Sequence, residues 1–221
     1  MKVLVVGASR GIGLELVRQY RHSGATVTAT ARDAAGLERV RSEGATAFAL
    51  DVTDPASAAG LAWQVEGVSF DVVILNAGVM GPRHAGLEPP TSAEFDQVMH
   101  TNVLGPMWLL PQLKDAVAPA GKLAVLSSRM GSMGLRTTPN AWLYRASKAA
   151  LNSVLKDASL ALAGRAICVA FHPGWVRTDM GGSGADLSVH DSVAGMRATL
   201  QGLQPRDNGA FFNFDGTPLP W

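Results

Sequence analysis

A strand, a glycine-rich turn and a helix open this 221-residue chain in direct succession. The apolar run 2–6 leads straight into three glycines with the spacing Gly7-x-x-x-Gly11-x-Gly13, and an amphipathic helical pattern follows and ends at Gly24. Glycines permit a tight turn, and they let a pyrophosphate approach the amides at the amino terminus of the helix. In this context the turn predicts a dinucleotide site at the first βα connection of a parallel sheet. A glycine-rich turn without a ligand is the alternative.

Strands and helices keep alternating along the rest of the chain. β-prone runs lie at 26–30, 45–50, 71–75, 122–127, 166–171 and 210–214. Helical patterns lie at 34–43, 92–117, 140–163 and 188–203, and Pro106 and Pro111 are expected to kink the second or to mark a turn. The chain shows no internal repeat, charge run or linker. We therefore expect an α/β fold with one doubly wound parallel sheet, helices on both faces and a single domain spanning 1–221.

The composition argues against nucleic acid and membranes as partners. The formal net charge is +1, which gives no electrostatic footprint for nucleic acid or for an anionic membrane surface. No run approaches the ~20 apolar residues that a membrane span needs, and the first residues lack the features of a targeting segment. Cys168 is the only cysteine, and its apolar neighbours favour a buried strand residue over a nucleophile. We expect a soluble cytoplasmic protein without a metal site.

Two arginines lie where a dinucleotide fold reads the adenosine ribose. Arg32 ends the second strand, and Arg10 lies inside the glycine turn. An arginine there can hold a 2′-phosphate, whereas an acidic residue accepts from a 2′-hydroxyl. The pair therefore favours NADP(H) over NAD(H), although Asp33 follows Arg32 directly and leaves the ribose ligand open. Two solvated surface arginines are the alternative.

Two further polar residues have two explanations each. Asp51 and Val52 follow the third strand at its carboxyl end, where ligands of open α/β sheets gather. Asp51 could accept from an adenine amino group, or it could cap a helix after Pro55. Asn102 lies in the middle of the expected helix 92–117, where an asparagine is locally unfavourable. It is therefore either a helix defect or a working residue.

Tyr144 and Lys148 lie four residues apart in the helical stretch 140–163, so their side chains share one face. A phenol titrates near pH ~10, and a fixed cation beside it favours the phenolate. Lowering this pKa by about 3 units needs roughly 4 kcal/mol of differential stabilisation, and it would make Tyr144 a general acid/base. Taken alone, the pattern is more often an ordinary helix pair.

The order of these residues resembles the short-chain dehydrogenase/reductase family, whose fold is a Rossmann-type sheet. The resemblance spans essentially the whole chain and rests on Gly7-x-x-x-Gly11-x-Gly13, Asn76-Ala77-Gly78, Asn102, Ser128, Tyr144-x-x-x-Lys148 and Pro173-Gly174. Within the family, the segment 144–152 and the final Asp215-Gly216 and Pro220-Trp221 look like the C-factor/sniffer-type carbonyl reductase group.

The resemblance implies a role for each matching position. Tyr144 would be the acid/base, and Lys148 would lower its pKa and bind the nicotinamide ribose. Ser128 would hydrogen-bond the substrate carbonyl, and it is preferred over Ser127 because the family's serine precedes an x-x-Gly step. Asn102 would hold a water in a proton relay to Lys148. The implied cofactor residues are Gly7, Ser9, Arg10, Gly11, Ile12, Gly13, Arg32, Asp51, Val52, Asn76, Ala77, Gly78, Tyr144, Lys148, Pro173, Gly174, Val176 and Thr178.

The implied reaction is hydride transfer between NADP(H) and a small-molecule carbonyl or alcohol, with NAD(H) as the less favoured cofactor. A second hypothesis is a dinucleotide-binding signalling protein of C-factor type with little turnover, and a third is a sugar-nucleotide epimerase that shares Tyr-x-x-x-Lys. The intact catalytic set argues against the second hypothesis. The short carboxyl-terminal region leaves little sequence for a sugar-nucleotide domain and argues against the third.

Three peripheral features complete these expectations. A substrate lid is expected near 179–191, and nearby apolar residues either wall a pocket or pack in the core, namely Trp175, Met130, Met133 and Trp142. A homodimer or homotetramer is expected to pair through 92–117 and 140–163. The tail 219–221 either covers apolar surface or is frayed.

Overall fold

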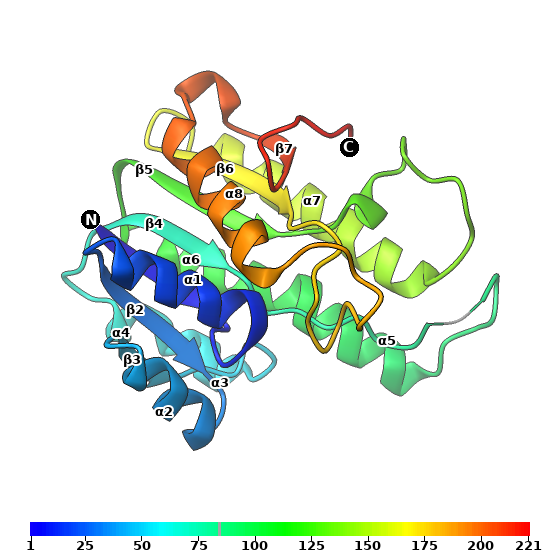
Figure 1. Cartoon of the computed structure of the whole chain (residues 1–221), viewed down its shortest axis with the longest axis horizontal. Coiled ribbons are helices and arrows are strands. Elements are labelled where there is room, and N and C mark those ends of the chain that lie inside the picture. Colours follow the sequence, from blue (N-terminus) through cyan, green and yellow to red (C-terminus); the bar gives the residue numbers. More distant parts are fainter. Residues whose placement is uncertain (84) are drawn as a thin grey trace.

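The computed structural model describes residues 1–83 and 85–221. One seven-stranded sheet has the order β3-β2-β1-β4-β5-β6-β7, and every neighbouring pair of strands is parallel (Figure 1). The expected doubly wound parallel sheet is therefore confirmed. Its strands are β1 Lys2–Val6, β2 Thr26–Ala31, β3 Thr46–Ala49, β4 Phe70–Leu75, β5 Val117–Leu126, β6 Ala166–His172 and β7 Ala210–Asn213.

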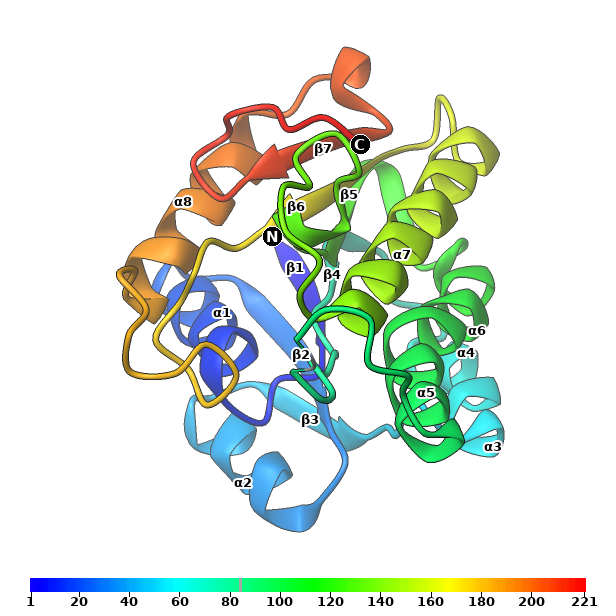
Figure 2. The same cartoon turned by 90° about the vertical axis from the view of Figure 1, so that its right-hand side faces the viewer.

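Helices cover both faces of the sheet. Figure 2 shows α1, α2 and α8 on one side, and α3 to α7 on the other. Two separate clusters of buried apolar side chains fill the two layers. The helices are α1 Gly11–His22, α2 Ala34–Ser42, α3 Pro55–Ala59, α4 Leu61–Gln64, α5 Ser92–Met99, α6 Gly105–Leu113, α7 Trp142–Ala161 and α8 Val189–Gly202.

The central strands are apolar without interruption because both of their faces are covered. In β1, Val3 and Val5 pack in the layer of α1 and α8, whereas Leu4 and Val6 pack in the opposite layer. All four side chains are completely buried. Cys168 in β6 is also buried and packs in the second layer, as its apolar neighbours predicted.

The expected helix 92–117 is three segments in the structure. The helix α5 is followed by a π-helical segment, His100–Leu104, and then by α6, which ends at Leu113. Pro106 falls in the first turn of α6, where a missing N–H is tolerated, and Pro111 lies inside α6 without ending it. The irregularity therefore lies before the prolines, at the segment that contains Asn102.

The last residues of the chain cover apolar surface, which was one of the two expectations for 219–221. The Trp221 ring stacks on Phe211 of β7, with 5.4 Å between centroids. The Leu219 N–H donates to the Phe211 carbonyl at 2.8 Å. The Trp221 carbonyl accepts from the Gly134 N–H at 3.3 Å, so the tail is also tied to the loop after β5.

Across residues 1–83 and 85–221, no helix combines the length and apolar character needed to cross a membrane.

Candidate active site

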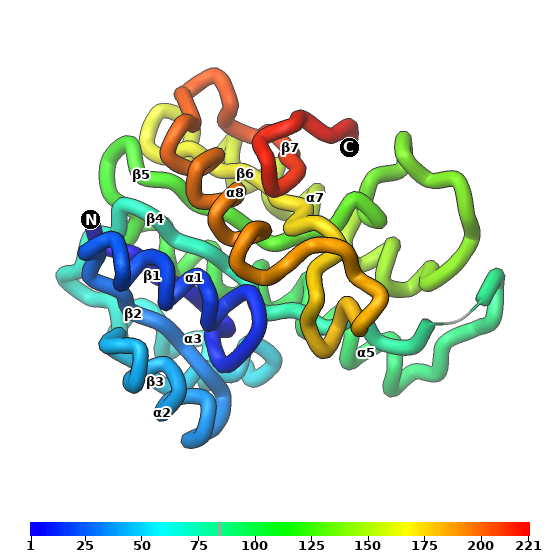
Figure 3. Tube along the Cα trace, viewed as in Figure 1, coloured from blue at the N-terminus to red at the C-terminus, as the bar shows by residue number. Residues whose placement is uncertain are grey.

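A cleft of about 450 Å³ opens at the carboxyl ends of the central strands. The chain builds outward from β1 to β3 and then returns to β4, so the strand order reverses between β1 and β4. Ligands of open α/β sheets bind at such a switch point. Figure 3 shows the loops after β5 and β6, in yellow-green and gold, extending beyond this edge of the sheet.

Most of the predicted site residues line this cleft, and five do not. Those that line it are Gly7, Ser9, Arg10, Gly11, Ile12, Arg32, Asp51, Val52, Asn76, Ala77, Gly78, Tyr144, Lys148, Pro173 and Thr178. The five others are Gly13, Asn102, Ser128, Gly174 and Val176. Ser127, which the sequence placed second to Ser128, also lines the cleft, as do Asp179 and Met180 of the expected lid. Lining residues that the sequence did not single out include Thr53, Val79, Thr101 and Arg177.

The glycine turn brings β1, α1 and the end of β4 together more closely than any side chain allows. Gly7 has a φ of 85°, and a Cβ there would lie 2.8 Å from Ala77. A Cβ on Gly13 would collide with the Gly7 carbonyl and would lie 2.6 Å from the Asn76 side chain. Gly13 therefore serves close packing under the turn, which explains why it does not line the cleft.

The amino terminus of α1 faces this turn with its first amides available. Arg10 is the N-cap residue, its side chain makes no capping hydrogen bond, and the first turn of α1 contains no acidic residue. The unpaired amides and the helix dipole together attract anions. The turn is therefore suited to a phosphate group.

At the end of the cleft beside β2 and β3, where the adenosine would bind, Asp33 and Asp51 have different roles. The Asp33 carboxylate caps α2 by accepting from the Gly36 N–H at 2.6 Å, so it is committed to the helix rather than to the end of β2. Asp51 does not cap a helix, because Asp54 is the N-cap of α3. That alternative for Asp51 was wrong, and its carboxylate instead lines the cleft.

Asp51 is held as an anion close to Arg32. Burial would raise the pKa of its carboxyl, but two hydrogen bonds from Thr53 and the Arg32 charge outweigh burial and lower the pKa. The Thr53 hydroxyl donates to Asp51 Oδ1 at 2.7 Å, and the Thr53 N–H donates to the same oxygen at 2.9 Å. The Asp51 carboxylate thus retains one oxygen for a ligand donor.

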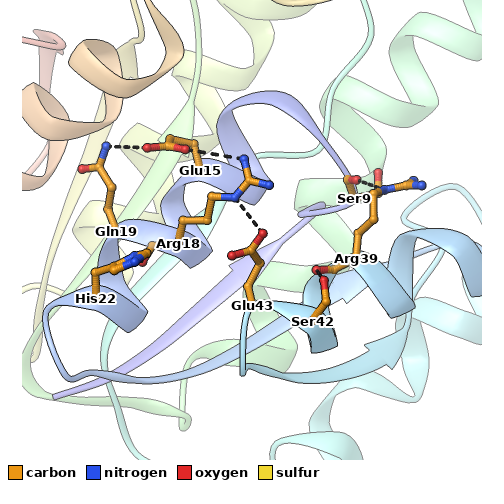
Figure 4. A network of polar contacts seen from close by, with 8 residues as sticks. All are labelled: Ser9, Glu15, Arg18, Gln19, His22, Arg39, Ser42 and Glu43. Atoms are coloured by element: carbon orange, nitrogen blue, oxygen red, sulfur yellow. Dashed lines mark hydrogen bonds and ion pairs between the residues drawn. The ribbon is translucent and has the colours of Figure 1, made fainter.

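A third arginine, not predicted from the sequence, reaches the same end of the cleft. Arg39 extends from α2, and its Nε donates to the Ser9 carbonyl at 2.8 Å (Figure 4). Gly36 makes this possible, because a Cβ at that position would lie 2.8 Å from the Ser9 side chain. The contact depends on tertiary packing of α2 against the glycine turn, and no sequence pattern marks it.

The proposed catalytic side chains meet on the inner face of α7. Tyr144 and Lys148 are 6% and 4% exposed, and both line the cleft. The Ser128 side chain interacts with the Tyr144 hydroxyl and acts to lower the Tyr144 pKa, and its oxygen accepts from the Met130 N–H at 3.1 Å. The Ser127 hydroxyl instead donates to the Asn152 side chain inside the protein. This geometry favours Ser128 over Ser127 as the partner of Tyr144.

The expected lowering of the Tyr144 pKa by Lys148 does not occur in this arrangement. Burial raises the pKa of Tyr144 to about 12, and the Ser128 hydrogen bond only partly opposes it. Burial also lowers the pKa of Lys148 to about 8. The Lys148 Nζ donates to the Leu126 carbonyl at 2.8 Å and lies 5.8 Å from the centroid of the Tyr144 ring. At neutral pH Tyr144 therefore holds its proton and is a donor.

Asn102 lies in the π-helical segment and is completely buried. Its Oδ1 accepts from the Val79 N–H, and its Nδ2 donates to the Val79 carbonyl, both at 2.8 Å. The same Nδ2 also donates to Ser147 in α7 at 2.9 Å. The side chain thus ties the loop after β4 to α7.

Gly78 marks the point where these groups converge. A Cβ on Gly78 would lie 3.2 Å from Asn102 Oδ1 and 3.3 Å from Lys148 Nζ. Any larger residue would therefore press on both polar side chains at the floor of the cleft.

The segment 175–187, which we call the strap, forms a loop at the mouth of the cleft. Its base is closed by a bridge between Val176 and Leu187, and the Arg177 N–H donates to the Leu187 carbonyl at 2.9 Å. Within the strap Val176 is buried, and Gly174 packs against Leu187, so neither lines the cleft. The predicted lid at 179–191 overlaps the strap, but its last residues belong to α8.

The four apolar residues expected to wall a pocket lie outside the cleft lining. Trp175 and Met133 are 55% and 71% exposed, so they are not core residues either. The Trp142 Nε1 donates to the Glu88 carbonyl at 2.9 Å and thereby links the start of α7 to the segment before α5.

Within the described residues, no cluster of three or more His, Cys, Asp or Glu side chains could hold a metal ion. Burial raises the pKa of the Cys168 thiol to about 11, which keeps the thiol protonated at neutral pH.

Comparison with known proteins gives a consistent result. A family model described as short chain dehydrogenase matches residues 1–186. C-signal of Myxococcus xanthus is 40% identical over 156 residues, which are 68% of this chain and 92% of that protein. The structure of the carbonyl reductase Sniffer of D. melanogaster has 32% identity and a TM-score of 0.89, covering 100% of this chain and 99% of that one. The NADPH-bound carbonyl reductase from chicken fatty liver has 34% identity and a TM-score of 0.86, covering 100% and 98%.

Proposed function

The chain belongs to the short-chain dehydrogenase family and is an oxidoreductase, and from this premise we propose that it is an NADP(H)-dependent reductase of ketones or aldehydes. The observation that carries the proposal is the buried pair of Tyr144 and Lys148, which lines a cleft whose other end is the glycine turn. Ser128 does not line the cleft itself, but its side chain interacts with the Tyr144 hydroxyl. Titratable groups with perturbed pKa values in a cleft are a property of active sites.

The cleft fits a nicotinamide dinucleotide on structural grounds. Its volume lies within the range of ~300–1,000 Å³ that is usual for ligand sites. The backbone of the glycine turn and the first amides of α1 would hold the pyrophosphate. Asp51 would accept from the adenine amino group, and Lys148 would bind the nicotinamide ribose.

The proposed mechanism assigns a separate task to each polar side chain. A bound nicotinamide supplies the hydride chemistry. The hydroxyls of Ser128 and Tyr144 hold the carbonyl oxygen between two donors, which stabilises the negative charge that develops there. Tyr144 then gives its proton to that oxygen, because an alkoxide is far more basic than a phenolate, even one with a raised pKa. In the free chain the Lys148 charge does not lower the Tyr144 pKa, and we propose that it stabilises the remaining phenolate only once the cofactor is bound, with its Nζ 5.8 Å from the centroid of the Tyr144 ring.

Two features of the adenosine end support a preference for NADP(H). The Asp33 carboxylate, which would disfavour a 2′-phosphate, is occupied in capping α2. Arg10, Arg32 and Arg39 come from three different segments that lie close to this end of the cleft. An arginine fork matches a phosphate better than other side chains do.

The signalling hypothesis is less favoured. C-signal is similar to this chain, but so are structures of carbonyl reductases that cover the whole chain. A module that only bound a dinucleotide would have no need of a buried tyrosine, serine and lysine at one end of the cleft.

The proposal predicts consumption of NADPH with carbonyl compounds. Purified protein is mixed with NADPH and a panel of ketones, aldehydes and quinones, and the loss of NADPH absorbance is followed. We expect turnover with at least one class, because the hydroxyls of Ser128 and Tyr144 are placed to donate to a carbonyl oxygen. Tight NADPH binding without turnover on the whole panel would contradict the enzyme and favour the signalling hypothesis.

The second prediction concerns cofactor choice. Arg32→Ala is expected to raise the NADPH dissociation constant about tenfold, since a charge-assisted hydrogen bond at an exposed site is worth ~1.5 kcal/mol. The NADH dissociation constant should hardly change, and added salt should narrow the difference between the two cofactors. Calorimetric titration measures both constants, and Arg206→Ala is a control that removes the same charge far from the cleft. Equal binding of NADH and NADPH by the unmodified chain would contradict the proposed preference.

The expected homo-oligomer, the cytoplasmic location and the single domain with a lid stay predictions. Pairing through α5, α6 and α7 is supported by exposed apolar side chains on these helices, namely Phe95, Met107 and Leu160.

A further inference from the structure

The strap is fastened across the mouth of the cleft from two sides. On one side, Arg10 of the glycine turn forms an ion pair with Asp179, with 2.6 Å between nitrogen and oxygen. On the other side, the Arg83 guanidinium donates to the Met180 carbonyl at 2.6 Å. Figure 2 shows the strap, in gold, running beside the amino-terminal end of α1, and Asp179 and Met180 both line the cleft.

The Arg10–Asp179 pair occupies one of the three arginines at the adenosine end of the cleft, where a 2′-phosphate would bind. Among the residues that the structure describes, Arg10 is the only one of the three arginines there that forms an ion pair with a carboxylate. Arg39 contacts a backbone carbonyl. The Arg10 and Asp179 side chains are 72% and 75% exposed, so their pair is screened by water and weak.

We propose that Asp179 is a specificity-determining residue, an internal anion that competes with the 2′-phosphate of the dinucleotide for Arg10. This inference rests on the proposed NADP(H)-dependent function. The Arg10 guanidinium binds either the Asp179 carboxylate of the strap or the 2′-phosphate of the cofactor, but not both fully at once. A cofactor without the 2′-phosphate leaves the ion pair in place.

The relative strength of the two anions decides which state prevails. A phosphate monoester carries about −1.5 to −2 charges at neutral pH and three acceptor oxygens, whereas the carboxylate carries one charge. The phosphate therefore displaces Asp179, but the displaced carboxylate remains beside it and repels it. Removing the carboxylate charge removes both the competition and the repulsion, and only ligands with a 2′-phosphate gain.

The test uses two ligands that differ only in the 2′-phosphate, adenosine 2′,5′-bisphosphate and adenosine 5′-monophosphate. Each is titrated calorimetrically into the full chain and into the variants Asp179→Asn and Asp186→Asn. Asp179→Asn is expected to lower the dissociation constant of the bisphosphate about two- to fivefold, the range that fits an exposed ion pair, and to leave that of the monophosphate unchanged. Asp186 is exposed on the same strap, and Arg10 pairs with Asp179 instead, so Asp186→Asn should change neither constant.

A double-mutant cycle isolates the competition. In an Arg10→Ala background, Asp179→Asn should no longer improve bisphosphate binding, because the contested cation is absent. The inference is overturned by an unchanged bisphosphate constant, by an equal gain for both ligands, or by a gain that persists without Arg10.

The outcomes separate this inference from the cofactor preference itself. An unmodified chain that binds both adenosine ligands equally contradicts the preference for NADP(H). A gain confined to the bisphosphate in Asp179→Asn would still support the competition at Arg10. A clear preference in the unmodified chain without any effect of Asp179→Asn overturns the competition alone.

Discussion

Tyr144→Phe is expected to lower the turnover of carbonyl compounds by ~10²–10⁴ or more, while the NADPH dissociation constant stays within a few-fold. The variant keeps the ring that packs in the α7 face and removes only the hydroxyl that touches Ser128. Since burial keeps this hydroxyl protonated at neutral pH, its loss removes the proposed proton donor and one of the two groups proposed to hold the carbonyl oxygen. Steady-state kinetics and calorimetric titration measure the two effects separately.

The chain provides a matched control for this substitution. Tyr20 is the other of the two tyrosines, it is also buried, and burial raises its pKa to about 12 as well. It lies in α1 against Arg197, outside the cleft. Tyr20→Phe should therefore keep full turnover and lose only a little stability. Near-normal turnover in Tyr144→Phe would remove Tyr144 from the mechanism.

Much of the fold could be predicted because the signals are local. Each central strand is a continuous apolar run, and each is followed by a turn residue or a polar cluster at the edge where the cleft forms. The alternation of these runs with helical patterns requires parallel strands, and parallel strands place their carboxyl ends at one edge. Gly7, Asn76 and Pro173 each follow the carboxyl end of a strand, so their place in the cleft lining could be predicted in this way.

The parts that could not be predicted depend on tertiary packing. The sequence predicted a kink or a turn at Pro106 and Pro111, but the irregular segment is His100–Leu104. There the Asn102 side chain hydrogen-bonds to Val79 and Ser147. Arg39 reaches Ser9 only because α2 packs tightly on the glycine turn.

The electrostatics of the Tyr-x-x-x-Lys pair could not be read from spacing either. Spacing places both side chains on one face of α7, but it does not give their burial or the direction of the Lys148 ammonium. The structure shows that burial dominates both groups, and that the ammonium faces the Leu126 carbonyl. Desolvation makes each group reluctant to ionise, which favours a protonated Tyr144 over a phenolate.

The same desolvation implies that Lys148 is held in the site at the expense of stability. Its pKa is lowered from 10.5 to about 8, so burying its charge costs roughly 3 kcal/mol at pH 7. A residue retained under such a penalty is more readily explained by chemistry than by folding.

Lys148→Met is expected to lower turnover by ~10² and to weaken NADPH binding by about ten- to a hundredfold, because the proposed function gives one ammonium two tasks, at the phenolate and at the ribose hydroxyls. Loss of only one of these two properties would show that the dual role is wrong. Lys156 lies on the same helix, is exposed, and provides the control variant Lys156→Met, which should keep both properties.

Although Lys148→Met is expected to weaken activity and NADPH binding, it should not destabilise the cofactor-free protein. Removing the buried charge relieves roughly 3 kcal/mol at pH 7, whereas leaving the Leu126 carbonyl without a donor costs about 1–3 kcal/mol, so the variant should be as stable as the parent or more stable. The pH dependence gives the sharper measurement. Because the folded chain releases the Lys148 proton near pH 8 and the unfolded chain keeps it until about 10.5, the parent gains stability as pH rises through this window.

Between pH 7 and 9 the parent should therefore gain roughly 1 kcal/mol in the free energy of unfolding relative to Lys148→Met. Other groups with shifted pKa values, such as His172, Cys168 and Tyr20, are present in both proteins and cancel in the difference. Urea unfolding of both proteins across this range measures the effect, and Lys156→Met should show no such gain. A difference that stays constant with pH would mean that Lys148 titrates normally and that its burial carries no penalty.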